Sequence, residues 1–239
     1  LADGAELSND VLHYDLGTVT NDAKITVNGK EIELSALLEK WTAPLEKVFP
    51  TKAEVPEIEV DVPLYSERNT SSPAIKTAKP TVFIPVFPGT NCEVDTARAF
   101  EKAGANVEML IVKNLSSNDI EETIDEMEKL IAKSQMIMLP GGFSGGDEPD
   151  GSGKFIATTF RNPRIAEQVN NLLKNRDGLM LGICNGFQAL IKLGLVPYGE
   201  IVDMTDESPT LTFNTIARHQ SMMVNTRIAS NKSPWLYGC

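Results

Sequence analysis

From residue 80 to residue 193, short apolar runs alternate with segments whose apolar residues recur every three or four positions. The runs are the length of buried strands, and the segments between them have the spacing of helices that bury one face. Strands that alternate with helices over short links predict an α/β fold with a mostly parallel sheet and helices on both faces. The predicted strands span residues 81–87, 107–112, 135–139 and 179–183.

Three sequence signals predict where the helices of this region begin. Thr90-x-x-Glu93 fits a capping box, and Asn118-x-x-Glu121 predicts the start of a second helix. Asn162-Pro163 puts proline at a first helical position, where its missing N–H costs nothing. Active sites of open parallel sheets lie at the carboxyl ends of the strands, so candidate chemistry is expected in the loops just after them.

The first 49 residues have a different pattern and are predicted to be a separate small unit. Residues 24–27 and 31–34 alternate about Asn28-Gly29, which indicates a hairpin with a type I′ turn. Ser35 is expected to cap a following helix, which Pro44 would kink or split. A hairpin and one helix are too small for an independent core, so this unit is expected to pack on other protein.

Residues 50–79 are rich in proline and acidic residues and separate this unit from a third region, residues 80–239. Such a composition is typical of an extended linker. An ordered arm lying along a neighbouring domain is an equally good interpretation. Its anchors would be Val60, Val62, Leu64 and Tyr65.

Composition narrows the functional classes. The 239 residues carry a net charge of −11, which argues against a nucleic-acid or anionic-membrane surface. No apolar stretch approaches the roughly 20 residues of a membrane span. The sequence shows no secretory leader, so a cytoplasmic location is expected. The cysteines, Cys92, Cys184 and Cys239, are few and without zinc-binding spacing, which suits a reducing compartment.

The stretch 179–188 is the most informative for function. An apolar strand runs into Gly182-x-Cys184-x-Gly186 and then into helical spacing, which predicts a nucleophile elbow with the thiol at its apex. A turn this tight needs residues without Cβ at the two glycines. Free N–H groups at the start of a helix favour a thiolate. The alternative is a buried structural cysteine, a common role for free cysteine.

A glycine-rich loop, residues 140–147, follows the third strand. A phosphate-binding Walker pattern does not fit, because Gly153-Lys154 precedes Phe155 rather than serine or threonine. The backbone N–H groups of Gly142, Phe143 and Asn185 are instead predicted to form an oxyanion hole. A plain surface loop remains the alternative.

Two further candidates are weaker. Cys92 follows the first strand but lacks the elbow glycines, so it is expected to be a buried or half-buried bystander. Cysteine acyl transfer needs a base, usually histidine. His13 lies far off in the first unit, and His219 is better explained as a polar residue lining a pocket.

Three motifs together resemble class I glutamine amidotransferases of the triad type, whose fold is flavodoxin-like. They are Phe87-Pro88-Gly89-Thr90-Asn91-Cys92-Glu93, Leu139-Pro140-Gly141-Gly142-Phe143-Ser144 and Gly182-Ile183-Cys184-Asn185-Gly186-Phe187-Gln188. Within that family the resemblance is to the glutaminase part of large phosphoribosylformylglycinamidine synthases, which fuse synthetase and glutaminase in one polypeptide. It covers residues 80–239, and residues 1–79 more weakly resemble the end of the synthetase part.

The resemblance implies roles for particular residues. Cys184 would attack the side-chain amide of glutamine, form a γ-glutamyl thioester and release ammonia. The binding residues would be Gly141, Gly142, Phe143, Asn185 and Gln188, with Ser221 lining the same pocket. This chain would hold no cofactor or metal. Mg-ATP would bind in the synthetase part, the partner that uses the ammonia to amidate formylglycinamide ribonucleotide in purine biosynthesis.

The sequence departs from the family pattern in two places. Gly145 stands where the family has an aromatic residue. The His-Gly-Glu-Gly segment that carries the family's catalytic His and Glu is not among these 239 residues, so a fragment that is inactive by itself is expected. Two alternatives remain: a non-catalytic docking or regulatory module that binds a synthetase, and a different cysteine enzyme built on the same elbow.

Overall fold

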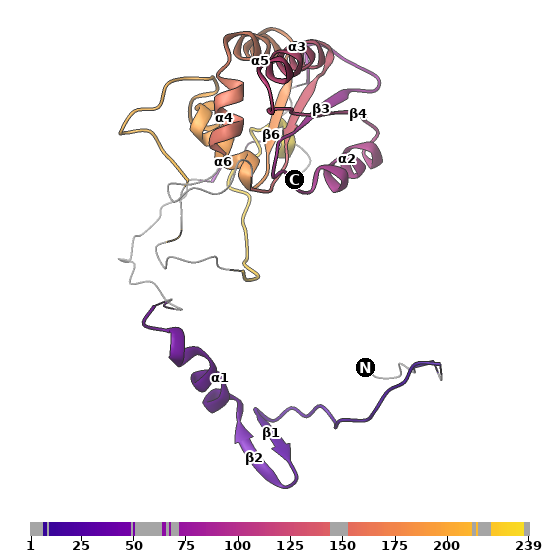
Figure 1. Cartoon of the computed structure of the whole chain (residues 1–239), viewed down its shortest axis with the longest axis vertical. Coiled ribbons are helices and arrows are strands. Elements are labelled where there is room, and N and C mark those ends of the chain that lie inside the picture. The colour runs from indigo at the N-terminus through magenta and orange to yellow at the C-terminus, as the bar shows by residue number, and fades with distance from the viewer. Residues whose placement is uncertain are drawn as a thin grey trace. The chain divides into compact units, whose positions relative to one another are not determined.

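The computed structural model describes residues 7–8, 10–48, 50, 64–65, 67, 72–143, 153–211, 214 and 221–236. The chain forms two compact units, Leu1–Val55 and Pro56–Cys239, which Figure 1 shows in one view.

The larger unit is built on a four-stranded parallel sheet with the order β4-β3-β5-β6. Its strands are β3 (Thr81–Val86), β4 (Asn106–Ile111), β5 (Met136–Leu139) and β6 (Leu179–Gly182). The first strand of the unit, β3, lies inside the sheet, with later strands on either side, which is the flavodoxin-type order. Ligands of such sheets bind where the order reverses, here outside the carboxyl ends of β3 and β5.

Helices cover both faces of this sheet, which confirms the predicted fold class (Figure 1). Alternate residues of β3 point to opposite faces. Phe83 packs in the larger core with α3, α4, α5 and α6, whereas Val82 packs in the smaller core with Ala97 of α2. The helices are α2 (Glu93–Lys102), α3 (Ser117–Lys133), α4 (Lys154–Phe160), α5 (Pro163–Asn175), α6 (Asn185–Leu193) and α7 (Leu195–Tyr198).

One of the three predicted helix starts is confirmed. Helix α5 begins at Pro163, and the side chain of Asn162 accepts a hydrogen bond from the N–H of Arg164 at 3.0 Å. Helix α3 begins two residues before the predicted start, because Ser116 is extended and its Oγ accepts from the N–H of Asp119. The Thr90 cap is wrong: Cys92 is the N-cap of α2, and the Thr90 hydroxyl accepts from the N–H of Phe87 instead.

Helix α4 was not predicted. Its sequence is rich in β-branched and aromatic residues, which weakens the helical signal. Tertiary packing overrides this preference, since Ile156, Ala157 and Phe160 are all buried in the larger core.

The smaller unit contains the predicted hairpin. Strands β1 (Lys24–Val27) and β2 (Lys30–Glu33) pair antiparallel, and Asn28 and Gly29 have φ values of 49° and 78°, as a type I′ turn requires. Helix α1 (Leu34–Thr42) follows directly, with Glu33 rather than Ser35 at its N-cap. Pro44 lies in the 3₁₀ turn η1 (Ala43–Leu45) just after α1, so it does end the α-helix. No residue of α1 is buried, and packing of this unit on other protein stays a prediction.

Most of the predicted linker lies outside the described residues, but two of its positions, Tyr65 and Ala74, fall within the larger unit and contact other parts of it. The N–H of Tyr65 donates to the carbonyl of Ala229 at 2.9 Å, and Lys232 Nζ lies 4.2 Å from the centre of the Tyr65 ring. The N–H of Ala74 donates to Asp177 Oδ2 at 2.8 Å. These contacts favour the ordered arm over the free linker at Tyr65 and Ala74.

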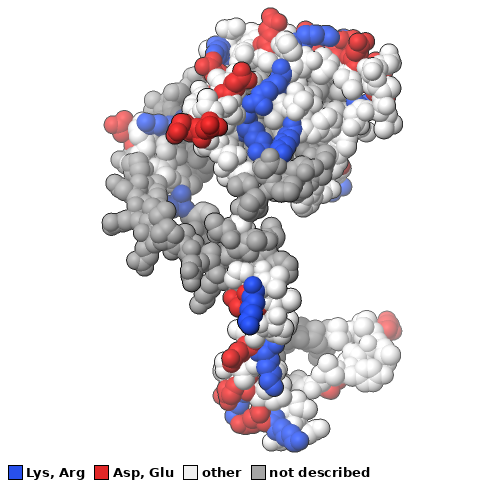
Figure 2. Space-filling view, turned by 60° about the vertical axis from the view of Figure 1, so that its left-hand side comes forward, with Lys and Arg blue, Asp and Glu red and all other residues white. Residues whose placement is uncertain are grey.

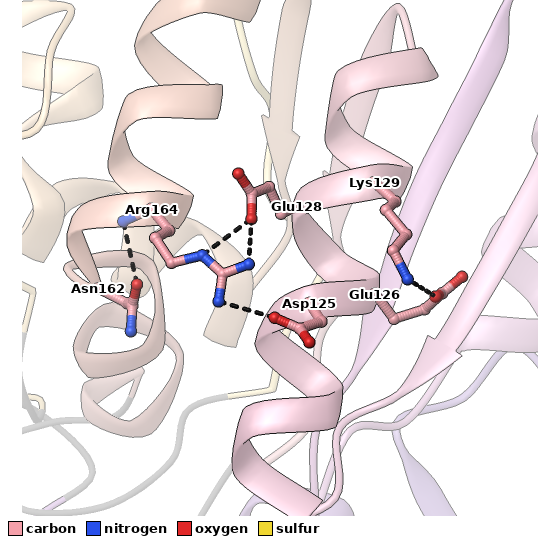
Figure 3. Close-up of polar contacts among 6 residues, drawn as sticks. All are labelled: Asp125, Glu126, Glu128, Lys129, Asn162 and Arg164. Atoms are coloured by element: carbon pink, nitrogen blue, oxygen red, sulfur yellow. Dashed lines mark hydrogen bonds and ion pairs between the residues drawn. The ribbon is translucent and has the colours of Figure 1, made fainter.

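Basic and acidic side chains lie close together on the face that Figure 2 draws. A group of this kind joins α3 to α5. Arg164 Nη1 lies 2.7 Å from Asp125 Oδ1, and the guanidinium also donates to Glu128 (Figure 3). The hydrogen bonds to Asp125 and Glu128 raise the pKa of Arg164, so the group stays charged. The pairs are exposed, and surface pairs contribute little to stability.

A second arginine binds the end of α3 through its backbone. The guanidinium of Arg176 donates to the carbonyls of Ile131, Ala132 and Ser134 at 2.7, 2.7 and 2.9 Å. Partial burial lowers the pKa of Arg176. The last carbonyls of a helix have no partner within the helix and carry the negative end of its dipole. A guanidinium here donates hydrogen bonds to these carbonyls and its positive charge is attracted by the dipole.

We expect Arg176→Ala to destabilise the larger unit by about 2 kcal/mol, because hydrogen bonds to charged groups contribute about 1.5–3 kcal/mol in mutational series. Arg164→Ala is the matched control, since it removes an exposed guanidinium that also bridges α3 and α5. Urea unfolding of both variants measures the difference. Equal losses of stability would contradict the role given to the bonds with the α3 carbonyls.

Candidate active site

Cys184 lies between β6 and α6, at the apex of the predicted strand–turn–helix. It is exposed and is the N-cap of α6, with φ 52° and ψ −110°. A positive φ is uncommon for a residue with a side chain and stores strain that the surrounding structure must hold. The structure therefore rules out the buried structural cysteine, and it shows the backbone strain of a nucleophile elbow.

The two glycines of the turn allow the helix to approach the sheet, as predicted. A Cβ built on Gly186 would lie 2.0 Å from the carbonyl oxygen of Leu139 in β5. A Cβ on Gly182 would lie 2.6 Å from the carbonyl oxygen of Gly186. Neither contact is possible, so both positions require glycine for the turn to form.

The glycine-rich loop after β5 faces this turn. A Cβ built on Gly141 would lie 3.3 Å from Cβ of Cys184, and the N–H of Ile183 donates to the carbonyl of Leu139 at 3.1 Å. Cys184 and the loop thus lie at the same edge of the sheet, as predicted. Residues 144–147 of the loop, with Ser144 and Gly145, lie outside the described residues.

The same loop is bonded to the turn after β3. The N–H of Asn91 donates to the carbonyl of Gly141 at 2.9 Å, and the N–H of Phe143 donates to the carbonyl of Gly89 at 2.8 Å. This corrects one expectation: because the Phe143 N–H is engaged with Gly89, it is not a free oxyanion donor. The Phe143 side chain is 61% exposed. The Gly142 N–H donates to no backbone carbonyl of the described residues.

Asn185 and Gln188 follow Cys184 on the first turn of α6. Asn185 is buried, at 1% exposure, and its side-chain Nδ2 lies 3.4 Å from Gln188 Oε1, a long hydrogen bond. Gln188 is half-buried, and its N–H donates to the carbonyl of Cys184 at 2.9 Å. This bond joins the first turn of α6 to the backbone of Cys184, the residue that carries the thiol.

The structure does not join Ser221 to this site. Ser221 is exposed and lies in an irregular segment, and no hydrogen bond or ion pair links it to another residue in the described ranges. His219 and Cys239 lie outside those ranges. His13 belongs to the smaller unit, where its Nδ1 lies 2.8 Å from the carbonyl oxygen of Val11.

Cys92 is exposed, so the expectation that it is buried or half-buried was wrong. Like Cys184 it is the N-cap of a helix and has a positive φ, 69°. The two helices differ in charge: the first turn of α2 carries Glu93 and Asp95, whereas the first turn of α6 has no acidic residue. Of these two cysteines, Cys184 is the one whose helix has no carboxylate in its first turn to offset the positive end of the helix dipole.

The sequence interpretation missed the residues that hold the loop, Phe87 and Thr90. The sequence signal for this turn was Pro88-Gly89, a dipeptide that marks a turn. Among the described residues, no three His, Cys, Asp or Glu side chains are grouped so that they could hold a metal ion. None of the helices in those ranges is both long and apolar enough to cross a membrane.

Comparisons with known proteins agree with this geometry. The family model for the CobB/CobQ-like glutamine amidotransferase domain matches residues 79–238. Subunit PurQ of phosphoribosylformylglycinamidine synthase from Dehalococcoides mccartyi is 37% identical over 133 residues, 56% of this chain and 46% of that protein. PurQ from Methanococcus maripaludis strain C5 is 34% identical over 148 residues, 62% of this chain and 50% of that protein.

One solved structure is also similar in sequence. A chain in the structure of PurLQS from Thermotoga maritima is 31% identical and aligns over 49% of this chain and 45% of its own length, with a TM-score of 0.34. The present chain spans about half the length of the curated relatives it matches. The predicted resemblance to glutamine amidotransferases is confirmed by the family match, which covers both the Cys184 turn and the loop that faces it. This chain belongs to the CobB/CobQ-like glutamine amidotransferase domain family.

Proposed function

We propose that the chain is the glutaminase part of a phosphoribosylformylglycinamidine synthase and that Cys184 is its nucleophile. The observation that carries the proposal is the placement of an exposed, strained Cys184 at the start of α6, against Gly141. The names of the relatives support the choice of reaction. Glutamine is the substrate, and the ammonia goes to a synthetase partner that holds Mg-ATP; this chain needs no cofactor of its own.

In the proposed reaction the Cys184 thiolate attacks the side-chain carbonyl carbon of glutamine. The carbonyl oxygen becomes an oxyanion, for which the Gly142 N–H and the N-terminal end of α6 provide stabilisation. The C–N bond then breaks, ammonia leaves with a proton from a general acid, and a γ-glutamyl thioester remains. Water hydrolyses the thioester to glutamate and restores the thiol.

Glutamine binding is assigned to Gly141, Gly142, Phe143, Asn185 and Gln188. Phe143 contributes its exposed side chain rather than its N–H, which Gly89 already accepts. Asn185 is assigned the role of holding Gln188 in place, because its side chain is buried and its Nδ2 lies 3.4 Å from Gln188 Oε1. A pocket role for Ser221, a cytoplasmic location and inactivity of these 239 residues by themselves stay predictions.

Thiol selectivity tests the proposal. In the full-length protein, a diazo-ketone analogue of glutamine should alkylate Cys184 before Cys92, although both thiols are exposed helix N-caps. The reasons are the absence of acidic residues in the first turn of α6 and the facing loop that can hold the carbonyl of the analogue. Peptide mapping after brief labelling measures the order. Earlier modification of Cys92 would mean that the elbow does not activate its cysteine, as expected of a non-catalytic docking module.

A further inference from the structure

We propose that the turn after β3, residues 87–91, is a clamp that orients the Gly142 N–H for the reaction at Cys184, with Thr90 as its positioning residue. The inference rests on the proposed function and assigns a role to a turn that lies beside the nucleophile without supplying it.

The clamp consists of two backbone hydrogen bonds between the turn and the loop. Asn91 donates to Gly141 and Phe143 donates to Gly89, at 2.9 and 2.8 Å, so Thr90 and Gly142 form an antiparallel bridge. Both hydrogen bonds are made by the residues that flank Thr90 and Gly142, and neither of them by these two residues themselves. Thr90 and Gly142 are therefore a non-hydrogen-bonded pair, in which the N–H and C=O of each residue point away from the opposite strand.

This pattern fixes the direction of the Gly142 peptide. Its N–H points away from the β3 turn, while the neighbouring residue, Gly141, lies against Cβ of Cys184. If the bridge slipped by one residue, the Gly142 N–H would turn toward the β3 strand end and be lost to the active site. The clamp thus decides which N–H of the loop is available for an oxyanion.

The close approach of the two segments depends on glycine. Gly142 has φ 131°, and a Cβ there would lie 2.4 Å from the carbonyl oxygen of Gly89 and 2.5 Å from the nitrogen of Asn91. No other residue fits this position with the bridge in place. The bridge between the two segments therefore requires glycine at position 142.

The turn itself is held by Thr90 and Phe87. The Thr90 hydroxyl accepts from the N–H of Phe87 at 3.0 Å, and the N–H of Thr90 donates to the carbonyl of Phe87 at 2.8 Å. Phe87 is buried, at 3% exposure, and its ring packs edge-on against Phe155 of α4 with 5.5 Å between ring centres. Thr90 thereby ties the clamp to a side chain anchored in the core.

A donor aimed at an oxyanion acts mainly in the transition state, because the oxyanion forms only there. A misplaced Gly142 N–H should lower kcat and leave KM for glutamine nearly unchanged. Alkylation of Cys184 by iodoacetamide proceeds by displacement at a methylene carbon and forms no oxyanion. Its rate therefore reports the state of the thiol and of the elbow independently of the clamp.

The test compares Thr90→Val, which removes the hydroxyl at nearly constant size, with Thr90→Ser, which keeps it, in the full-length protein. We expect Thr90→Val to lower kcat for ammonia release from glutamine by roughly tenfold or more, with about 10²–10³-fold as the upper limit set by complete loss of an oxyanion donor. KM and the iodoacetamide rate at Cys184 should stay near the wild-type values, and Thr90→Ser should restore kcat.

Three results would overturn the clamp. They are an unchanged kcat in Thr90→Val, an equal loss of kcat and of iodoacetamide reactivity, and a loss that serine does not restore. An equal loss would mean that Thr90 supports the fold as a whole. A wild-type protein that releases no ammonia from glutamine would instead overturn the proposed function and the clamp with it, so the two failures are distinguishable.

Discussion

Replacing Cys184 by alanine in the full-length protein should lower glutamine-dependent synthase activity by at least ~10³-fold, because removal of a covalent nucleophile leaves only binding and electrostatic contributions. Activity with added ammonia should persist, since free ammonia does not need the thioester. The measurement is the rate of amidine product formation with each nitrogen source, in the presence of Mg-ATP.

Cys92→Ala is the matched control for this substitution. Cys92 is the other exposed free cysteine in the described part of the chain, and it is also a helix N-cap with a positive φ. The Cys92→Ala variant should keep glutamine-dependent activity. If both variants lost activity with glutamine and with ammonia alike, the effect would be on the fold or on the partner interface, and the role given to Cys184 would be wrong.

Gly186→Ala should have the largest effect on stability of the substitutions considered, a loss of at least about 3 kcal/mol, since overpacking of a closely packed interior typically costs 1–3 kcal/mol or more. The new Cβ would lie 2.0 Å from the carbonyl oxygen of Leu139 and 2.7 Å from its Cβ. Backbone of a central strand cannot move aside as a flexible side chain can. Thermal or urea unfolding of the larger unit measures the loss.

Gly199→Ala is the control for the loss of glycine itself. Gly199 has φ 75° with nothing within 4 Å of an added Cβ, so alanine there costs only the strain of a left-handed conformation, about 1–2 kcal/mol. A loss in Gly186→Ala no greater than in Gly199→Ala would contradict the close approach of α6 to β5.

The sequence predicted the sheet well because each strand is a distinct apolar run between polar turns. The alternation of such runs with helical spacing led to the α/β fold, and the Gly182-x-Cys184-x-Gly186 spacing led to the elbow, because only glycine permits the observed approach to Leu139. Helix α4 was missed because its propensity is weak, and burial of Phe160 and its neighbours overrides it.

The finer geometry of the site could not be read from the sequence. The Phe143 N–H was expected to face an oxyanion, but it bonds to Gly89, a residue more than fifty positions away. Thr90 matched a helix cap in the sequence, yet its hydroxyl serves the preceding turn. The two errors have different causes. Backbone pairing between distant segments engages the Phe143 N–H, and local sequence signals do not include such pairing. The Thr90 error is local, because the hydroxyl accepts from the N–H of Phe87 only three residues earlier.

The most direct test of the account is to identify the covalent intermediate. The full-length protein is mixed with glutamine, quenched in acid within a few turnovers, digested and analysed by mass spectrometry, with Cys184→Ala and Cys92→Ala treated alike. The account predicts a glutamyl thioester on the peptide that contains Cys184, present in wild type and Cys92→Ala and absent from Cys184→Ala. A glutamyl group on Cys92, or ammonia release that persists in Cys184→Ala, would contradict it.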